Sequence, residues 1–117
     1  MTYWNEKIET MPKEDLKAMQ LELLKELVKN TYRDSKFYRE RMDAAGVKPE
    51  DIKTLDDIRK LPFMKKTDLR DNYPDKLFVR PYDDLVRIHV SSGTTGKPTV
   101  VGYTRNDLDN WAESLDR

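Results

Sequence analysis

Residues 91–99 read Ser91-Ser92-Gly93-Thr94-Thr95-Gly96-Lys97-Pro98-Thr99, and the rest of the sequence is arranged around this stretch. Two β-prone runs flank it, residues 86–90 before it and residues 99–103 after it, so we predict two antiparallel strands joined by a loop. Glycines let backbone N–H groups turn towards an anion, hydroxyls add donors, and Lys97 adds a mobile positive charge. This composition favours a phosphate-binding loop, and the plainer interpretation is a polar hairpin loop.

The loop differs from a Walker A loop, G-x-x-x-x-G-K-[ST], at two positions. Counting back from Gly96 places Ser91 where that pattern has its first glycine, and Pro98 takes the position of the magnesium-binding hydroxyl. A Walker A loop also opens a helix, whereas Thr99-Val100-Val101 is β-branched and predicts a strand. A kinase or NTPase that uses an unusual phosphate loop is therefore poorly supported.

Further short segments accompany the loop: Tyr3-Trp4-Asn5, Phe37-Tyr38-Arg39, Leu61-Pro62-Phe63, residues 66–74, Arg87-Ile88-His89 and residues 98–104. The loop resembles that of the adenylate-forming enzymes, the superfamily of acyl-CoA synthetases and adenylation domains, in which S-[ST]-G-[ST]-T-G-x-P joins two strands. The flanking segments are similar to those of the phenylacetate-CoA ligase family. The resemblance extends over essentially the whole chain.

The resemblance implies a mixed α/β fold that forms the N-terminal part of an adenylate-forming enzyme. Residues 1–84 are then a helical N-terminal region, and residues 85–117 begin the AMP-binding domain with its phosphate loop at 91–99. The implied reaction, in phenylacetate catabolism, joins phenylacetate or a related aryl or acyl acid to coenzyme A. ATP activates the acid as an adenylate and releases pyrophosphate, and the thiol of coenzyme A then displaces AMP.

The same resemblance implies the binding residues. The β- and γ-phosphates of ATP would be held by Ser92, Gly93, Thr94, Thr95, Gly96 and Lys97, with Ser91 and Thr99 framing the loop. ATP, Mg²⁺ and coenzyme A are the implied cofactors. The acid, the remainder of the ligase chain and a homodimer are the implied partners.

At 117 residues the chain is far shorter than members of this superfamily, so we expect an N-terminal fragment of an AMP-forming ligase. In the family, the adenine-binding segment, the magnesium-coordinating glutamate and the lysine that acts in adenylation lie beyond residue 117. We therefore expect no catalytic or metal-binding residue within these 117 positions, and the chain alone is predicted to be inactive. The alternative is a truncated, non-catalytic module that docks a partner chain.

Composition narrows the functional classes. Lysine and arginine together number 22, and so do aspartate and glutamate, so there is no net field to attract nucleic acid or an anionic membrane. The sequence contains no cysteine, which excludes a disulfide scaffold and a thiolate nucleophile within these residues. No apolar run approaches ~18 residues and the start has no signal character, so we predict a cytoplasmic protein.

Local patterns predict several helices. Pro12 opens the strongest one, and its apolar residues form one broad arc that we expect to pack on the core. The arc contains Leu16, Met19, Leu21, Leu23, Leu24, Leu27 and Val28.

Shorter helices are expected to follow. Ser35 is predicted to cap a helix that ends before Gly46, and short turns begin at Pro49 and Thr54. Thr67 is expected to cap a turn over residues 68–71. Thr104 and Asp107 have the spacing of a capping box that opens a last helix.

A few polar residues have two interpretations. Arg70, Asp71 and Tyr73 could contact a ligand, but a surface helix end with local ion pairs is the plainer interpretation. Asp83-Asp84 is more typical of a turn than of a metal site. His89 shares the polar side of its strand with Arg87, opposite an apolar side, and is either a structural residue or a border of the nucleotide or acyl pocket.

Overall fold

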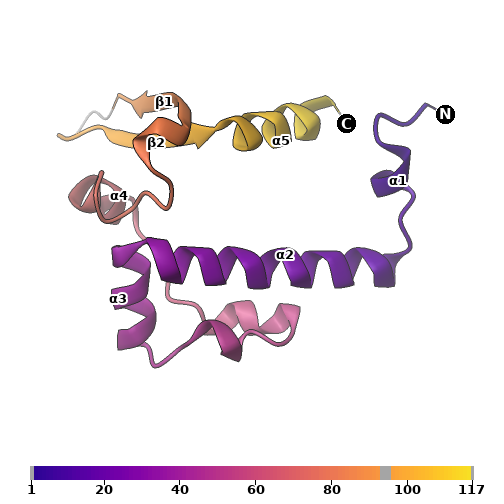
Figure 1. The fold of residues 1–117 in the computed structure, drawn as a ribbon, viewed down its shortest axis with the longest axis horizontal. Helices are drawn as coiled ribbons and strands as arrows, with labels where there is room; N and C mark the ends of the chain where they lie inside the picture. The colour runs from indigo at the N-terminus through magenta and orange to yellow at the C-terminus, as the bar shows by residue number, and fades with distance from the viewer. Residues whose placement is uncertain (1, 93–95, 117) are drawn as a thin grey trace.

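The structure, a computed structural model, describes residues 2–92 and 96–116 and has a long central helix between two layers (Figure 1). The hairpin and the last helix lie on one side of α2 (Lys13–Asp34), and α3 (Lys36–Ala44) with the two 3-10 helices directly after it lies on the other. The mixed helix and strand architecture confirms the predicted fold class. The elements are α1 (Glu6–Glu9), α2 (Lys13–Asp34), α3 (Lys36–Ala44), the 3-10 helices η1 (Pro49–Asp51) and η2 (Leu55–Lys60), α4 (Lys66–Asn72), the 3-10 helix η3 (Tyr82–Asp84), β1 (Leu85–Ser91), β2 (Thr99–Thr104) and α5 (Arg105–Asp116).

The helix α2 begins directly after Pro12, whose φ of −54° suits a helix start and whose missing N–H has no role there. The acidic residues Glu14 and Asp15 in its first turn face the positive end of the helix dipole. The predicted apolar arc is only partly covered, because Val28 is buried while Leu27 keeps 63% of its surface exposed. The described chain therefore supplies a packing partner for one part of the arc only.

A small hydrophobic core lies where α2 meets α3 and the segment that follows it. Its buried members are Val28, Met42, Val47 and Ile52, and Leu24, Tyr32 and Leu61 pack against it. Hydrophobic burial of this kind is the main force that holds the helices together. The C-terminal half of α2 thus fixes the orientation of this helix relative to α3.

The link between α2 and α3 is fixed by Ser35, which is almost fully buried. Its Oγ accepts a hydrogen bond from the Tyr38 N–H at 3.4 Å and donates one to the Lys76 carbonyl at 2.8 Å. The predicted cap is confirmed, and it also ties α3 to the segment after α4. Gly46 ends the α3 region at a φ of 68°, as the left-handed stop requires.

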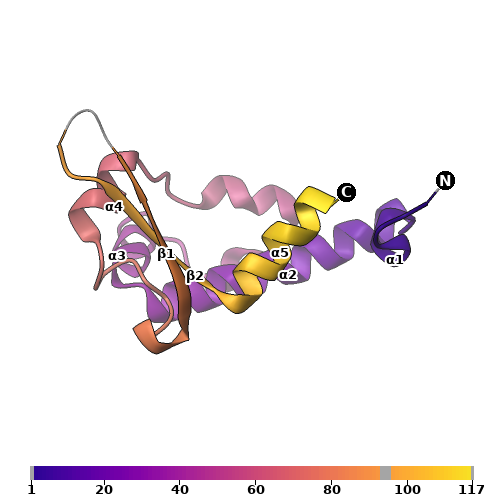
Figure 2. The same ribbon diagram turned by 90° about the horizontal axis from the view of Figure 1, so that it is seen from above.

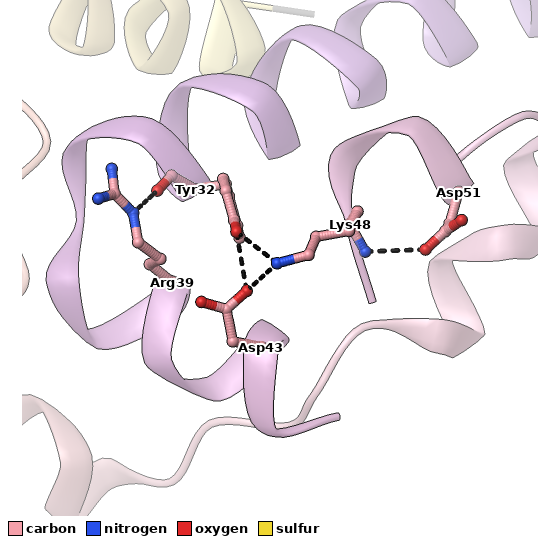
Figure 3. Close-up of polar contacts among 5 residues, drawn as sticks. All are labelled: Tyr32, Arg39, Asp43, Lys48 and Asp51. Atoms are coloured by element: carbon pink, nitrogen blue, oxygen red, sulfur yellow. Dashed lines mark hydrogen bonds and ion pairs between the residues drawn. The ribbon is translucent and has the colours of Figure 1, made fainter. Parts of the chain in front are cut away.

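An exposed polar network joins α2, α3 and η1 (Figure 3). The Tyr32 hydroxyl donates to Asp43 Oδ1 at 2.8 Å, and Lys48 Nζ donates both to the Tyr32 hydroxyl, at 2.8 Å, and to Asp43. The hydrogen bond from Lys48 holds the pKa of the Asp43 carboxyl below its usual range. Arg39 Nε donates to the Tyr32 carbonyl at 2.9 Å. Tyr32, near the end of α2, is therefore held both through its hydroxyl and through its backbone carbonyl.

Caps formed by aspartates start the short helices η1, η2 and α4. Asp57 Oδ2 accepts from the backbone N–H groups of Lys53 and Thr54, as the capping-box spacing predicts. These bonds hold the pKa of the Asp57 carboxyl well below its usual range. The expected cap at Thr67 is wrong: the N-cap of α4 is Lys65, whose N–H donates to Asp68 Oδ2 at 2.7 Å. The Asp68 carboxylate can accept from the N–H of any residue, so the helix starts two residues earlier.

The described chain is more extended than a compact domain of its length. Its radius of gyration is 16.6 Å, against about 13 Å for a compact 117-residue domain. Large apolar side chains stay exposed on several elements, among them Leu23, Leu27, Ile58, Phe63, Val90 and Leu115. Within the described residues, no helix is long and apolar enough to cross a membrane.

We expect the small core to dominate the stability of the helical layer. Replacing Ile52, which is 2% exposed, with alanine should lower the free energy of unfolding by about 2–5 kcal/mol, because a buried side chain is lost and a cavity remains. Urea denaturation of the chain measures this. The control is Ile58→Ala at a 54% exposed position, which should cost about 1 kcal/mol or less. Equal losses at both positions would contradict the described core.

Candidate phosphate-binding site

The two predicted strands form an antiparallel hairpin. His89 pairs with Val101, Ile88 with Gly102, and Ser91 with Thr99. Ser91 and Thr99 are the last partners in this register, so they mark one end of the paired strands. The sequence expectation of two antiparallel strands is confirmed.

The loop residues that the structure describes are mostly exposed. Ser91, Ser92, Gly96 and Lys97 face solvent, so their donors can reach a ligand. Gly96 has a φ of 105°, a conformation that residues with a Cβ rarely adopt, which explains why a glycine is needed there. The predicted binding residues Gly93, Thr94 and Thr95 lie outside the described residues.

Thr99 differs from the other predicted site residues because it is 9% exposed. Its Oγ1 is buried and has no hydrogen-bond partner in the described part of the chain. The only other buried side-chain donor without a partner among those residues is Nε of Arg70, on α4. The helix α4 packs against β2 and lies beside the loop end of the hairpin in two perpendicular views (Figures 1 and 2).

Three aromatic rings attach α5 to the hairpin. His89 lies 4.8 Å from Tyr103 and 5.8 Å from Trp111 between ring centroids, and the Tyr103 and Trp111 rings stack at 5.8 Å. The helix begins at the predicted capping box, in which the Thr104 N–H donates to Asp107 Oδ2 at 2.9 Å. His89 therefore packs between a strand and a helix, which supports its structural interpretation.

The apolar side of β1 is less covered than its polar side. His89 is half-buried by the rings, whereas Val86, Ile88 and Val90 stay exposed, Val90 to 59%. The reason is that α5 packs on the ring side of the hairpin, while α4 and Phe78 lie against β2. The alternation in the sequence shows two faces of the strand but not which face the rest of the chain covers.

An apolar cavity of about 250 Å³ lies between β2 and the segments around α4. Its lining includes Tyr38, Leu69, Phe78, Leu85 and Val101. The Tyr38 hydroxyl donates to Met64 Sδ at 2.8 Å, and burial raises the pKa of that hydroxyl. Sequence patterns did not predict this cavity, because its residues come from segments far apart along the chain.

The described residues do not contain a metal-binding group. No cluster of three or more His, Asp or Glu side chains that could hold a metal ion occurs in residues 2–92 and 96–116. Asp83 and Asp84 are exposed and belong to η3, as their turn interpretation predicts. The hydroxyl of Ser92 and the ammonium of Lys97 are hydrogen-bond donors, a chemistry that suits an anion such as phosphate better than a metal ion.

Solved structures with the same fold are CoA ligases. A 2-hydroxyisobutyryl-CoA ligase in complex with 2-HIB-AMP and CoA matches 98% of this chain with a TM-score of 0.86 and 32% identity. An open conformation of that ligase with the same ligands matches with a TM-score of 0.84. The chain covers 25% of the first structure and 27% of the second. The hairpin and its supporting helices thus have the fold of a segment of an adenylate-forming CoA ligase.

Curated relatives define the class more narrowly. Phenylacetate-coenzyme A ligases from Escherichia coli (strain K12) and Thermus thermophilus are each 54% identical over 110 residues, which is 94% of this chain. The enzyme of Aromatoleum evansii is 51% identical over 112 residues. Over 94% of its length, the chain is therefore related to the phenylacetate-coenzyme A ligases. It spans about a quarter of the length of these relatives. No protein-family model matches it.

The packing of Leu85 and Phe78 against β2 depends on a glycine at position 102. A Cβ on Gly102 would lie 2.8 Å from Leu85 Cδ1 and 3.1 Å from Phe78 Cζ. Gly102→Ala should therefore lower the free energy of unfolding by about 1–3 kcal/mol, measured by urea denaturation. In a Leu85→Val background the same change should cost less, because the crowding δ carbons are gone. An equal cost in both backgrounds would contradict the close approach.

Proposed function

We propose that this chain provides the ATP-phosphate-binding loop and its helical support to an AMP-forming aryl- or acyl-CoA ligase that uses phenylacetate. The observation that carries the proposal is the hydroxyl- and glycine-rich loop between paired strands. It occurs in a chain that is 54% identical to phenylacetate-coenzyme A ligases over 94% of its length. The proposed division is a helical region at 1–84 and the start of the AMP-binding domain at 85–117, because β1 begins at Leu85, directly after η3.

The proposed reaction has two steps. A carboxylate oxygen of the acid attacks the α-phosphorus of ATP, the bond to the bridging oxygen breaks, and pyrophosphate leaves. The sulfur of coenzyme A then attacks the acyl carbon of the adenylate, with loss of the thiol proton, and AMP leaves. The product of the second step, besides AMP, is the thioester of the acid with coenzyme A.

The physical difficulty of the first step is electrostatic. A carboxylate must approach a polyanion, and negative charge accumulates on the departing pyrophosphate. Positioned donors offset this charge, and the loss of one well-placed donor in an enzyme costs about 3 kcal/mol in the transition state. In this chain Ser92 and Lys97 are both exposed, so a hydroxyl and an ammonium group of the predicted loop are open to a ligand.

The remaining components are proposed to come from the rest of the ligase polypeptide. They are the magnesium ligands, the adenine site and the catalytic lysine, so the 117-residue chain alone is proposed to be inactive. Coenzyme A and the acid are proposed ligands of the complete site. A cytoplasmic location, no nucleic-acid partner and a homodimer complete the proposal; the equal numbers of acidic and basic residues support the second of these.

A second candidate function is a non-catalytic module that docks a partner chain. Exposed apolar side chains on α2, β1 and α5 favour it, because a surface of this kind is stable only when something covers it. The same exposure also supports a missing remainder of one ligase chain. The two candidates differ in whether the loop has any chemistry to perform.

The test replaces Lys97 with alanine in the longest natural polypeptide that contains this sequence. Loss of the cation should slow ATP–pyrophosphate exchange in the presence of phenylacetate about 10- to 100-fold, because a charge-assisted contact to phosphate is removed. Lys53→Ala, at another exposed lysine on the helical side, is the control and should leave the exchange rate unchanged. A Lys97 variant with wild-type exchange contradicts the assigned loop. Absence of exchange in the wild type, with partner binding unaffected by Lys97→Ala, supports the docking module.

A further inference from the structure

Two buried donors lack an acceptor among the described residues, Arg70 Nε and Thr99 Oγ1. Native proteins leave few buried polar groups unpaired, since each one has given up its contacts with water. Thr99 is more than nine-tenths buried, and Arg70 is half-buried. Both groups therefore keep a hydrogen-bonding capacity that the described residues do not use.

The two donors belong to elements that pack on one another at the loop end of the hairpin. Thr99 is the first residue of β2 and pairs with Ser91, the last residue of β1. Arg70 is on α4, which packs against β2, and both ribbon views place α4 beside the loop end (Figures 1 and 2). The two donors thus belong to elements that meet at the end of the hairpin where the strand pairing stops.

The charge of Arg70 is also uncompensated within the described chain. A guanidinium is always protonated in a protein, so it requires an anion or water. The carboxylate of Asp68, two residues earlier on α4, is bound to Arg41 at 2.7 Å. The local ion pairing that the sequence suggested for Arg70 is absent among the described residues.

We propose that Arg70, together with the Thr99 hydroxyl, is a second anion-binding point that holds the pyrophosphate portion of ATP from beneath the loop. The proposal rests on the proposed ligase function and assigns a new residue to it. A guanidinium presents a fork of N–H donors that matches the oxygens of a phosphate, and a hydroxyl adds one further donor. Helix α4 thereby contributes a cation from an element separate from the hairpin.

The competing explanation is that Arg70 binds a carboxylate or a carbonyl of the remaining polypeptide and only supports the fold. The two explanations differ in their effect on pyrophosphate. A ligand contact changes the KM for ATP and pyrophosphate, and it changes the increase in Tm that pyrophosphate produces. A purely structural contact lowers the Tm of the free protein and leaves both quantities unchanged.

The experiment uses Arg70→Gln and Thr99→Val in the longest natural polypeptide that carries this sequence, assayed by ATP–pyrophosphate exchange. Arg70→Gln should raise the KM for pyrophosphate and for ATP about tenfold or more, because a hydrogen-bonded charge is lost. Thr99→Val should raise them several-fold. The KM values for the acid and for coenzyme A should change less than twofold. The control is Arg59→Gln, an exposed arginine on η2 that is ion-paired with Asp56 at 3.3 Å, and it should behave as wild type.

Each outcome decides the matter. If the wild type exchanges and Arg70→Gln leaves the KM for pyrophosphate unchanged, this inference is overturned while the ligase function stands. If the wild type shows no exchange, the proposed function fails and the inference fails with it. If Arg70→Gln does not fold, Arg70→Lys decides: a raised KM with a wild-type Tm supports ligand binding, and a lowered Tm with a wild-type KM overturns it.

Discussion

The pairing of β1 with β2 is the constraint on which the candidate site depends. The register that places Ser91 opposite Thr99 determines where the loop leaves the hairpin. A two-stranded hairpin is marginally stable by itself in water, so it needs support from packing. Here α4 and Phe78 lie against β2, and the Trp111 ring of α5 packs on His89 and Tyr103. The helical layer therefore holds the two paired strands in a defined place.

The helices of this chain are joined by many exposed polar contacts and by only a small buried core. Aspartate caps and the Tyr32 network bind the helices to one another at their ends, while the buried core stays small. Such exposed polar contacts specify geometry more than they stabilise, because water competes for the same groups. The apolar residues of β1, and Leu27 on α2, remain uncovered. Relatives four times as long as this chain would have residues to cover them.

The sequence predicts the parts of this fold that are decided locally. The caps at Ser35, Thr54 and Thr104 follow from neighbouring residues alone, because each depends on backbone groups within four positions. The two strands follow from their β-branched runs, which lie close together along the chain. The α4 start was misjudged because Asp68, and not a hydroxyl, supplies its cap. The half-covered arc of α2, the cavity beneath β2 and the unpaired Arg70 depend on which segments meet in space. A single sequence does not contain that information in its local pattern.

The central claim is that the hairpin works within a larger body of protein that covers the apolar side of β1. Hydrogen exchange of the amides in residues 85–91 tests it most directly, measured in the isolated 117-residue chain and in the longest polypeptide that carries this sequence in its native cell. The account predicts fast exchange in the isolated chain, where the strand is held in a two-stranded sheet, and strong protection in the longer polypeptide. Equal protection in both would contradict it.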